Sequence, residues 1–198
     1  MNDFKTRILW VIVIAIVSGC AGNSQNLIHK NTKDKISAKT IAILPMEAMN
    51  ADYRDVQLLR TRIFEQMFFK GYSKIALKEI DARLESFKGN TGKAKTSETV
   101  SDILKNSFNA DAAMSCTLKK ENKFLFIYAP VRITVICELR NTDTDEVVWK
   151  AQTQSVKRNF DFTKKRLQKK SMEDLESLID EASRKVLETL PDGPNLVN

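Results

Sequence analysis

The alternation of apolar and polar positions predicts that the folded part of the chain begins near residue 40. Residues 40–45 form a short, β-branched apolar run that ends at a proline, which is typical of a buried central strand. Residues 53–70 place apolar side chains at helical spacing and are followed by Gly71, so they predict an amphipathic helix. The apolar face of this helix consists of Val56, Leu59, Ile63 and Met67, with Phe64 and Phe68 beside it.

The next segment predicts shorter elements. Residues 74–77 fit a second strand, residues 80–87 fit a short helix or turn, and the glycines within residues 88–93 indicate a loop. Thr96 or Ser97 is suited to cap a further helix. The apolar positions of that helix are Val100, Ile103, Leu104 and Phe108.

The last part predicts an antiparallel meander and a closing helix. Apolar residues alternate with polar or small ones over residues 112–118 and 131–139, and a third strand, 146–156, follows the turn at 141–145. Residues 172–190 have helical spacing. The order of elements predicts an α+β domain over residues 40–190, in which helices pack on one face of a mixed β-sheet and a C-terminal helix precedes a tail at 191–198.

The N-terminus has the pattern of a secretory signal. Lys5 and Arg7 precede ten apolar residues, 8–17, and two small residues then precede Cys20. The apolar run is shorter than the about 20 residues that span a bilayer, and an uncleaved transmembrane anchor is the alternative. The Val-Ser-Gly-Cys ending resembles the bacterial lipobox.

That resemblance implies that residues 1–19 are a signal peptide and that Cys20 becomes the acylated N-terminus. Three acyl chains hold a protein at a membrane essentially permanently. Ala21 rather than Asp follows the cysteine, which implies the outer membrane. An ordinary secreted protein is the alternative. Residues 20–39 are mostly polar and predict a flexible tether.

Composition argues against most catalytic chemistry. The single histidine, His29, falls in the tether without a ligand at metal-binding spacing. The sequence contains no P-loop, Gly-x-Ser-x-Gly or Cys-x-x-Cys motif, and Asp111, Asp143 and Asp145 are typical of turns and caps. We therefore expect no catalytic residues, no cofactor and no metal, with a carboxylate-only hydrolase as the alternative.

Positive charge is concentrated near the C-terminal end. Seven basic residues oppose Asp161 alone within residues 156–170: Lys157, Arg158, Lys164, Lys165, Arg166, Lys169 and Lys170. Nucleic acid is the usual partner of such a segment, but a secreted, lipidated chain does not meet it. The accessible partners are anionic headgroups, lipopolysaccharide phosphates, peptidoglycan carboxylates or an acidic protein. The alternative is a solvated loop between the last strand and the closing helix.

Two further features leave alternatives open. Cys116 and Cys137 share the apolar parity of adjacent strands and face each other if the connection is centred near Phe126, which permits either a disulfide or two free core cysteines. The apolar run 124–128 fits either a buried strand or an exposed hairpin tip. As a tip it would contact a partner or a membrane through Phe124, Phe126 and Tyr128.

Several short motifs, in order, resemble a family. They are Ile41-Ala42-Ile43-Leu44-Pro45, Gly71-Tyr72, Asn109-Ala110-Asp111-Ala112-Ala113, and Asp143-Thr144 before Val147-Val148-Trp149. This succession resembles bacterial envelope lipoproteins with a domain similar to the N-terminal domain of TolB, a group that includes CsgG and LpoB. The resemblance covers about residues 40–156 and implies a TolB-like, CsgG-like domain. Asp145 departs from the glycine usual there, and residues 123–130 lack the alternation of a membrane strand, so we expect no pore.

Together these features predict an outer-membrane-anchored periplasmic lipoprotein. We expect a non-enzymatic accessory or assembly component of a cell-envelope export or transport complex. Its expected partners are the membrane through its lipid, other envelope proteins and further copies of itself, and not nucleic acid. An activator of peptidoglycan synthesis and a small periplasmic hydrolase are the alternatives.

Overall fold

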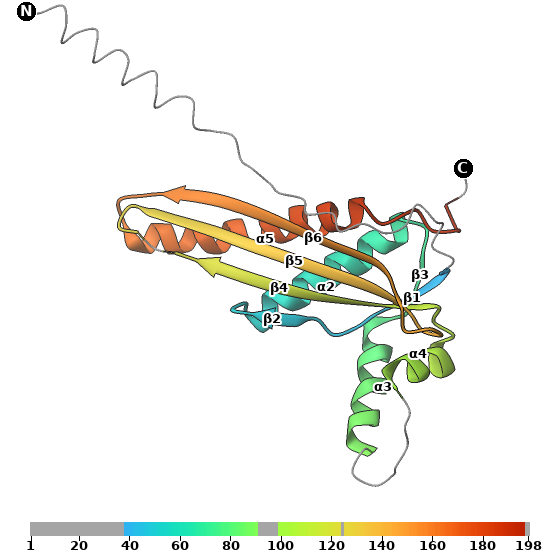
Figure 1. The fold of residues 1–198 in the computed structure, drawn as a ribbon. Helices are drawn as coiled ribbons and strands as arrows, with labels where there is room; N and C mark the ends of the chain where they lie inside the picture. The colour runs from blue at the N-terminus through green and yellow to red at the C-terminus, as the bar shows by residue number, and fades with distance from the viewer. Residues whose placement is uncertain (1–37, 91–98, 124, 197–198) are drawn as a thin grey trace, which may run out of the picture.

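The fold is that of a computed structural model that describes residues 38–90, 99–123 and 125–196. Within these ranges six strands and four helices follow one another along the chain (Figure 1). They are β1 (Thr40–Ile43), β2 (Glu47–Met49), α2 (Tyr53–Phe69), β3 (Ser73–Lys74), α3 (Leu77–Asn90), α4 (Val100–Phe108), β4 (Ala112–Asn122), β5 (Tyr128–Asn141), β6 (Val147–Phe160) and α5 (Lys164–Glu188).

All six strands form one mixed sheet in the order β3-β1-β4-β5-β6, with β2 paired to β4 beyond the end of β1. The short strands β1, β2 and β3 pair in parallel with their neighbours. The long strands β4, β5 and β6 pair antiparallel. Figure 1 shows the long strands extending as an arm away from the end that carries β1, β3, α3 and α4.

The main core lies between the sheet and the two long helices α2 and α5. The predicted stripe of α2 is fully inside it, because Val56, Leu59, Ile63 and Met67 are at most 3% exposed. These side chains meet alternate residues of β1, β4 and β5 together with the apolar face of α5. The α+β fold, a mixed sheet with packed helices and a C-terminal helix, is therefore confirmed, and α2 and α5 share one face of the sheet.

A smaller cluster lies on the other side of the sheet, at the end where β1 and β3 pair. Ala42 and Ala113 point away from the main core and meet Ile80 of α3 and Leu104 of α4. Arg60 of α2 is buried beside this cluster. Its guanidinium reaches Asp81 of α3 at 2.8 Å and donates to the carbonyl of Ile43 at 2.8 Å, which links one helix of each layer to β1.

The chain behaves differently from the sequence-based prediction where β6 passes into α5. β6 continues to Phe160 because its ladder with β5 extends to the pair Tyr128 and Phe160, and α5 begins at Lys164. The end of the last strand predicted at residue 156, and the alternative of a solvated loop over the basic segment, are therefore wrong. Its residues are the end of a strand and the first turns of a helix, in which Lys, Arg, Leu and Gln favour helical backbone.

Smaller differences concern α3 and α4. α3 continues to Asn90, where the sequence indicated a loop, and β3 is limited to Ser73–Lys74. Thr99 caps α4, whereas the predicted caps Thr96 and Ser97 lie outside the described residues. The backbone N–H of Thr99 donates to Asp102 at 2.8 Å, and this bond is the main reason why the pKa of Asp102 is lowered.

The C-terminal residues fasten onto the end of α2. The backbone N–H of Gly193 donates to the carbonyl of Lys70 at 2.6 Å, and that of Asn195 donates to Gly71 at 3.1 Å. Gly71 has a φ of +77°, and a Cβ atom on it would lie 2.6 Å from the backbone of Leu196. Only glycine fits both requirements at this crossing.

Candidate functional site

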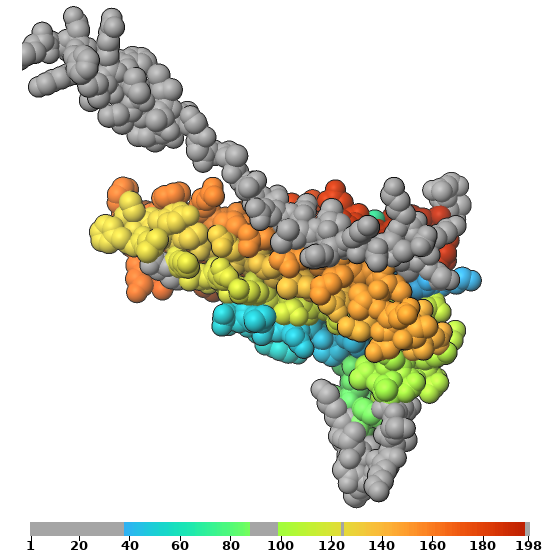
Figure 2. Space-filling view, viewed as in Figure 1, coloured from blue at the N-terminus to red at the C-terminus, as the bar shows by residue number. Residues whose placement is uncertain are grey.

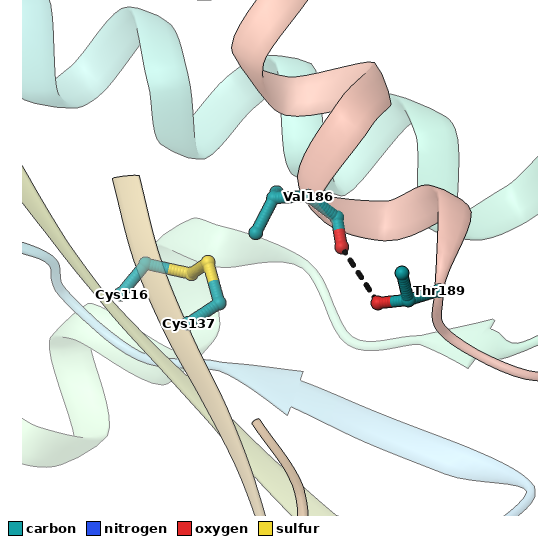
Figure 3. The surroundings of a disulfide bond; sticks show 4 residues. All are labelled: Cys116, Cys137, Val186 and Thr189. Atoms are coloured by element: carbon teal, nitrogen blue, oxygen red, sulfur yellow. Dashed lines mark hydrogen bonds between the residues drawn. A yellow bond between two sulfur atoms is a disulfide. The ribbon is translucent and has the colours of Figure 1, made fainter. Parts of the chain in front are cut away.

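A disulfide joins the two central strands of the long arm (Figure 3). Cys116 of β4 and Cys137 of β5 are direct cross-strand partners, and both are buried on the face that α5 covers. The sequence left bridged and free cysteines open, and the structure contains the bridge. It lies just beyond Met114, the last β4 residue paired with β1, so it ties β4 to β5 between the pairing of β4 with β1 and its pairing with β2.

The connection between β4 and β5 forms the tip of the arm. Leu125 and Tyr128 exchange backbone hydrogen bonds of 2.8 and 2.6 Å across it. Between them, Phe126 adopts a φ of +38°, in the left-handed region, and its side chain is 96% exposed. A buried strand is therefore not what this run forms. Phe124, the other phenylalanine predicted to make an apolar contact, lies outside the described residues.

The end of β6 places further aromatic rings beside this tip. Tyr128 packs against Phe160 with 4.8 Å between ring centroids, and the N–H of Asp161 donates to the carbonyl of Ile127 at 3.0 Å. Phe160 is 62% exposed and Phe162 is 93% exposed. Residues 125–128 and 158–166 thus form one surface, here called the hairpin end, which occupies one extremity of the molecule in Figure 2.

The sequence analysis missed Phe160 and Phe162. The last strand was predicted to end at residue 156, so only the positive charge of the following segment was considered and its aromatic residues were not. The available signal was the pattern Phe160-Asp161-Phe162, two aromatic residues inside a basic run. Whether these two rings are exposed depends on the turn between β6 and α5. No apolar periodicity in the sequence predicts that turn.

Some basic residues of this region are neutralised within the molecule. Lys157 lies 3.2 Å from Asp174, and Lys170 lies 3.3 Å from Asp161. Asp161 also accepts the backbone N–H of Thr163 at 3.0 Å, which contributes most to lowering its pKa, followed by Lys170. These contacts of Lys157, Lys170 and Asp161 therefore fasten α5 to the end of β6.

The remaining basic residues keep their charge at the surface. Lys169 faces Glu173 at 3.6 Å, a weak pair one helical turn apart. Among the described residues, four exposed cations of the hairpin end make no ion pair: Arg158, Lys164, Lys165 and Arg166. The structure thus separates the predicted basic segment into residues that hold α5 in place and residues that face solvent.

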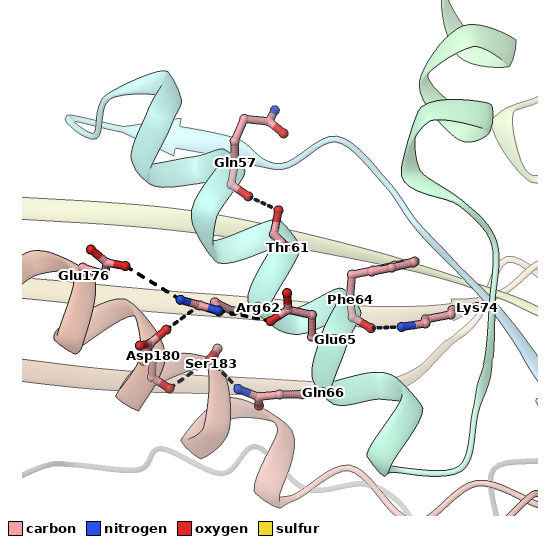
Figure 4. Close-up of polar contacts among 10 residues, drawn as sticks. All are labelled: Gln57, Thr61, Arg62, Phe64, Glu65, Gln66, Lys74, Glu176, Asp180 and Ser183. Carbon is pink, nitrogen blue, oxygen red and sulfur yellow. Dashed lines mark hydrogen bonds and ion pairs between the residues drawn. The ribbon is translucent and has the colours of Figure 1, made fainter.

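A polar network holds α2 on α5 away from the hairpin end (Figure 4). The Nε of Arg62 lies 2.7 Å from Asp180, and its Nη atoms reach Glu65 at 3.2 Å and Glu176 at 3.7 Å. Glu65 first, and then Asp180, raise the pKa of Arg62. The network fixes the two long helices to each other.

A hollow of the surface lies where α2 and α5 end. It measures about 760 Å³ and is lined by apolar groups such as Phe69 and Leu187 together with charged ones. Lys70 on its wall pairs with Asp192 at 3.0 Å. Nearby, Tyr72 donates to the carbonyl of Pro191 at 2.8 Å, and burial, with a smaller effect of Asp192, raises its pKa to about 12.

The aspartates of the family-like motifs have structural partners. Asp111 accepts the backbone N–H groups of Lys39 and Thr40 at 2.7 and 2.9 Å, which joins the start of β4 to the start of β1. Asp145 adopts a φ of +55° in the turn before β6, and Asn109 has a φ of +50° at the end of α4. Both residues occupy the backbone conformation that glycine favours.

Two further observations concern metals and membranes. Over residues 38–90, 99–123 and 125–196, no group of three or more His, Cys, Asp or Glu side chains is arranged to hold a metal ion. No helix in the same ranges is both long and apolar enough to cross a membrane. Cys20 and the predicted tether lie outside the described residues.

The fold is shared with bacterial proteins of known structure. PelC from Paraburkholderia phytofirmans, solved as a dodecamer, matches with a TM-score of 0.56 and 14% identity over 87% of this chain and 99% of its own. Lipoprotein GNA1162 from Neisseria meningitidis matches with a TM-score of 0.51 and 9% identity over 70% of this chain and 96% of its own. No family model and no curated protein matches the sequence. At these identities the likeness establishes the fold.

Proposed function

We propose that the protein is a lipid-anchored, non-enzymatic accessory component of a cell-envelope export or transport complex. Acyl chains on Cys20 hold it at the periplasmic face of the outer membrane, and it works as an assembly of identical copies. The observation that carries this proposal is the match to nearly the whole of a PelC subunit, which was solved as a dodecamer.

The lipid anchor is supported by two independent features. The chain has a basic, apolar and Val-Ser-Gly-Cys succession at its N-terminus, and it shares its fold with a lipoprotein, GNA1162. The order of the motifs supports a place among envelope lipoproteins with a TolB-like, CsgG-like domain. Recognition of neighbours, rather than turnover of a substrate, is the activity that suits such a module.

A binding role is also supported by how the acidic groups are used. Asp111 fixes two backbone N–H groups, Asp143 pairs with Lys105, and Asp161 fastens the start of α5. Each of these carboxylates therefore stabilises the fold. The exposed apolar and cationic side chains of the hairpin end, in contrast, have no such partners and are suited to contacts with other surfaces.

Fractionation of cells tests the anchor. We expect the native protein in the outer-membrane fraction, and Cys20→Ala or globomycin to leave an unprocessed precursor outside that fraction. Ser24→Ala is the matched control, because it is an equally small change near the acylation site and leaves both Cys20 and the disulfide intact. Normal maturation of Cys20→Ala with unchanged membrane association would contradict the proposal.

Mass measurement of the intact protein tests the assembly. We expect the acylated protein, extracted in mild detergent, to give oligomers of identical copies. Crosslinking in intact cells, followed by capture of the protein, then identifies components of an export or transport complex. A monomer at every concentration, with no crosslinked envelope partner, would contradict this part of the proposal.

A further inference from the structure

The hairpin end exposes aromatic side chains that a protein in water normally buries. Phe126 is 96% exposed and Phe162 is 93% exposed, while Phe160 and Leu125 are more than half exposed. They come from two segments far apart in sequence, which the hydrogen bond from Asp161 to Ile127 holds together. An exposed apolar group of this kind, gathered from separate segments, marks a contact surface.

The backbone supports the outward position of the central ring. Phe126 adopts a positive φ, which is unfavourable for a bulky L-residue and persists only where the surroundings impose it. The two hydrogen bonds between Leu125 and Tyr128 impose it here, because they close the turn around Phe126. The ring is therefore presented at the apex of the arm and not folded back onto it.

The charge on this surface selects an anionic partner. Arg158, Lys164 and Lys165 are exposed and, among the described residues, make no ion pair. The single carboxylate of the hairpin end, Asp161, is turned toward the N–H of Thr163 and the ammonium group of Lys170. The exposed net charge is therefore positive around the aromatic rings.

The shape of the hairpin end suits a bilayer better than a protein groove. Figures 1 and 2 show it as the protruding extremity of the long strands. The hollows of about 760 and 400 Å³ are lined by residues of other regions. A convex tip of exposed rings surrounded by Lys and Arg matches the interface of an anionic membrane, where rings enter the acyl boundary and cations contact phosphates.

The predicted tether is long enough to let the tip and the acyl anchor meet one membrane. β1 pairs with the first residues of β4, so Ala38 lies at the opposite end of the sheet from the tip. The eleven residues of β4 span about 36 Å. The nineteen residues from Cys20 to Ala38 can span at most about 65 Å.

We infer that the hairpin end docks on the surface of an anionic phospholipid bilayer. Phe126 and Phe162 enter the boundary between headgroups and acyl chains, and Arg158, Lys164 and Lys165 contact lipid phosphates. This inference rests on the proposed location at the outer membrane and adds a second contact to the acyl anchor. The two contacts together would set the arm against the bilayer in a defined orientation.

Vesicle partition of the unacylated chain tests this inference separately from the anchor. Residues 20–198 with Cys20→Ser keep every strand and helix described above. We expect this protein to bind vesicles of phosphatidylethanolamine with phosphatidylglycerol and to bind phosphatidylcholine vesicles far more weakly. Because no acyl chain is present, binding here is independent of whether Cys20 is lipidated in cells.

Two sets of variants separate the aromatic from the cationic contribution. Phe126→Ser with Phe162→Ser is expected to lower partition about ten-fold or more for each ring. Neutralising Arg158, Lys164 and Lys165 to Gln is expected to lower it on the order of one hundred-fold, since each cation near an anionic surface contributes about five-fold. The matched controls are Phe69→Ser and the triple change of Arg54, Lys78 and Arg184 to Gln, which lie elsewhere and should have little effect.

A tryptophan at the tip reports its depth directly. In the chain without its leader, Trp149 is the sole tryptophan and is buried, so Phe126→Trp adds an exposed reporter. We expect its emission to shift to the blue with phosphatidylglycerol vesicles and to be quenched by brominated acyl chains. Equal partition of the hairpin-end variants and their controls, or an unshifted emission, would overturn the inference, as would binding to a protein partner alone. Failure of lipidation in cells would instead contradict only the proposed anchor.

Discussion

The two ends of β6 differ in which of their side chains are buried. Toward the short strands, the inner face of β6 carries Trp149 and Ala151, which join the main core. Toward the hairpin end, the same face carries Thr153, Ser155 and Asn159, which are buried but polar. The large apolar group at this end of β6, Phe160, lies outside instead. The comparison shows that β6 adds large apolar groups to the core at one end, while its other end supplies a contact surface.

The largest expected effect tests this difference on a single helix. Leu178 and Leu167 of α5 are at most 2% exposed, but only Leu178 belongs to the main core cluster, while Leu167 lies in the first turn beside the hairpin end. We expect Leu178→Ala to lower the free energy of unfolding by about 4 kcal/mol and Leu167→Ala by about 2 kcal/mol, because the site inside the main core leaves the less collapsible cavity. Denaturant titration measures both values. Equal losses would show that the two sites are equally well packed.

Removal of the disulfide is expected to have the next largest effect. The bond links residues 21 positions apart, and a loop of this size gives about 3 kcal/mol in the chain-entropy account. Cys116→Ala with Cys137→Ala should therefore lower the unfolding free energy by that order. Alkylation of the unfolded, unreduced mature protein should label neither cysteine. Two labelled thiols would show that the strands are not crosslinked.

High pH is expected to weaken the end of the molecule where the C-terminal residues pack on the end of α2. The pKa of Tyr72 is raised to about 12 by burial, so the folded state favours the neutral phenol. Its contribution is complete below the ordinary pKa of about 10 and is lost as the pH rises toward about 12. Thermal unfolding across this range should show the loss, and Tyr72→Phe should reduce its pH dependence. An unchanged profile in the variant would assign the loss to other groups.

Low pH is expected to loosen the hairpin end by a smaller amount. The N–H of Thr163, followed by Lys170, lowers the pKa of Asp161, so the carboxylate stabilises the fold above its ordinary pKa. That contribution falls as the pH drops through the lowered value. Amide hydrogen exchange at the start of α5 should therefore speed up in acid more than exchange in α2. Asp161→Asn should remove most of the difference, and a variant that keeps it would exclude this carboxylate as the cause.

The smallest expected effect belongs to the exposed rings. Phe126→Ser and Phe162→Ser should change the unfolding free energy by no more than about 0.5 kcal/mol, because both side chains are already in water. Denaturant titration provides the measurement. A loss comparable to that of Leu167→Ala would mean that these rings pack within the molecule, and the contrast between the two ends would fail.

Periodic patterns made much of the fold predictable. The helical spacing of Leu59, Ile63 and Met67 located the buried face of α2, and the strand parity of Cys116 and Cys137 located two strands and their register. In each case the backbone is regular, so side chains at a fixed interval face the same side of the element, and the spacing of apolar residues predicts which side is buried. The antiparallel geometry then follows from the position of the turn.

Other features depend on contacts that no local pattern reports. Arg60 is buried because Asp81 and the carbonyl of Ile43 meet it from other elements. The extension of β6 to Phe160 depends on pairing with β5, and the early start of α5 lies within charged residues of no apolar period. The hairpin end therefore could not be assembled from the sequence, although both its apolar and its basic parts were identified separately.

The crossing of Gly193 over Gly71 has a consequence for the order in which the molecule matures. Gly193 and Asn195 donate hydrogen bonds to carbonyl groups at the end of α2, more than 120 positions earlier in the chain. A chain synthesised only as far as α5 cannot yet make these bonds. The C-terminal end of α2 therefore gains its last backbone partners after every other element has been synthesised.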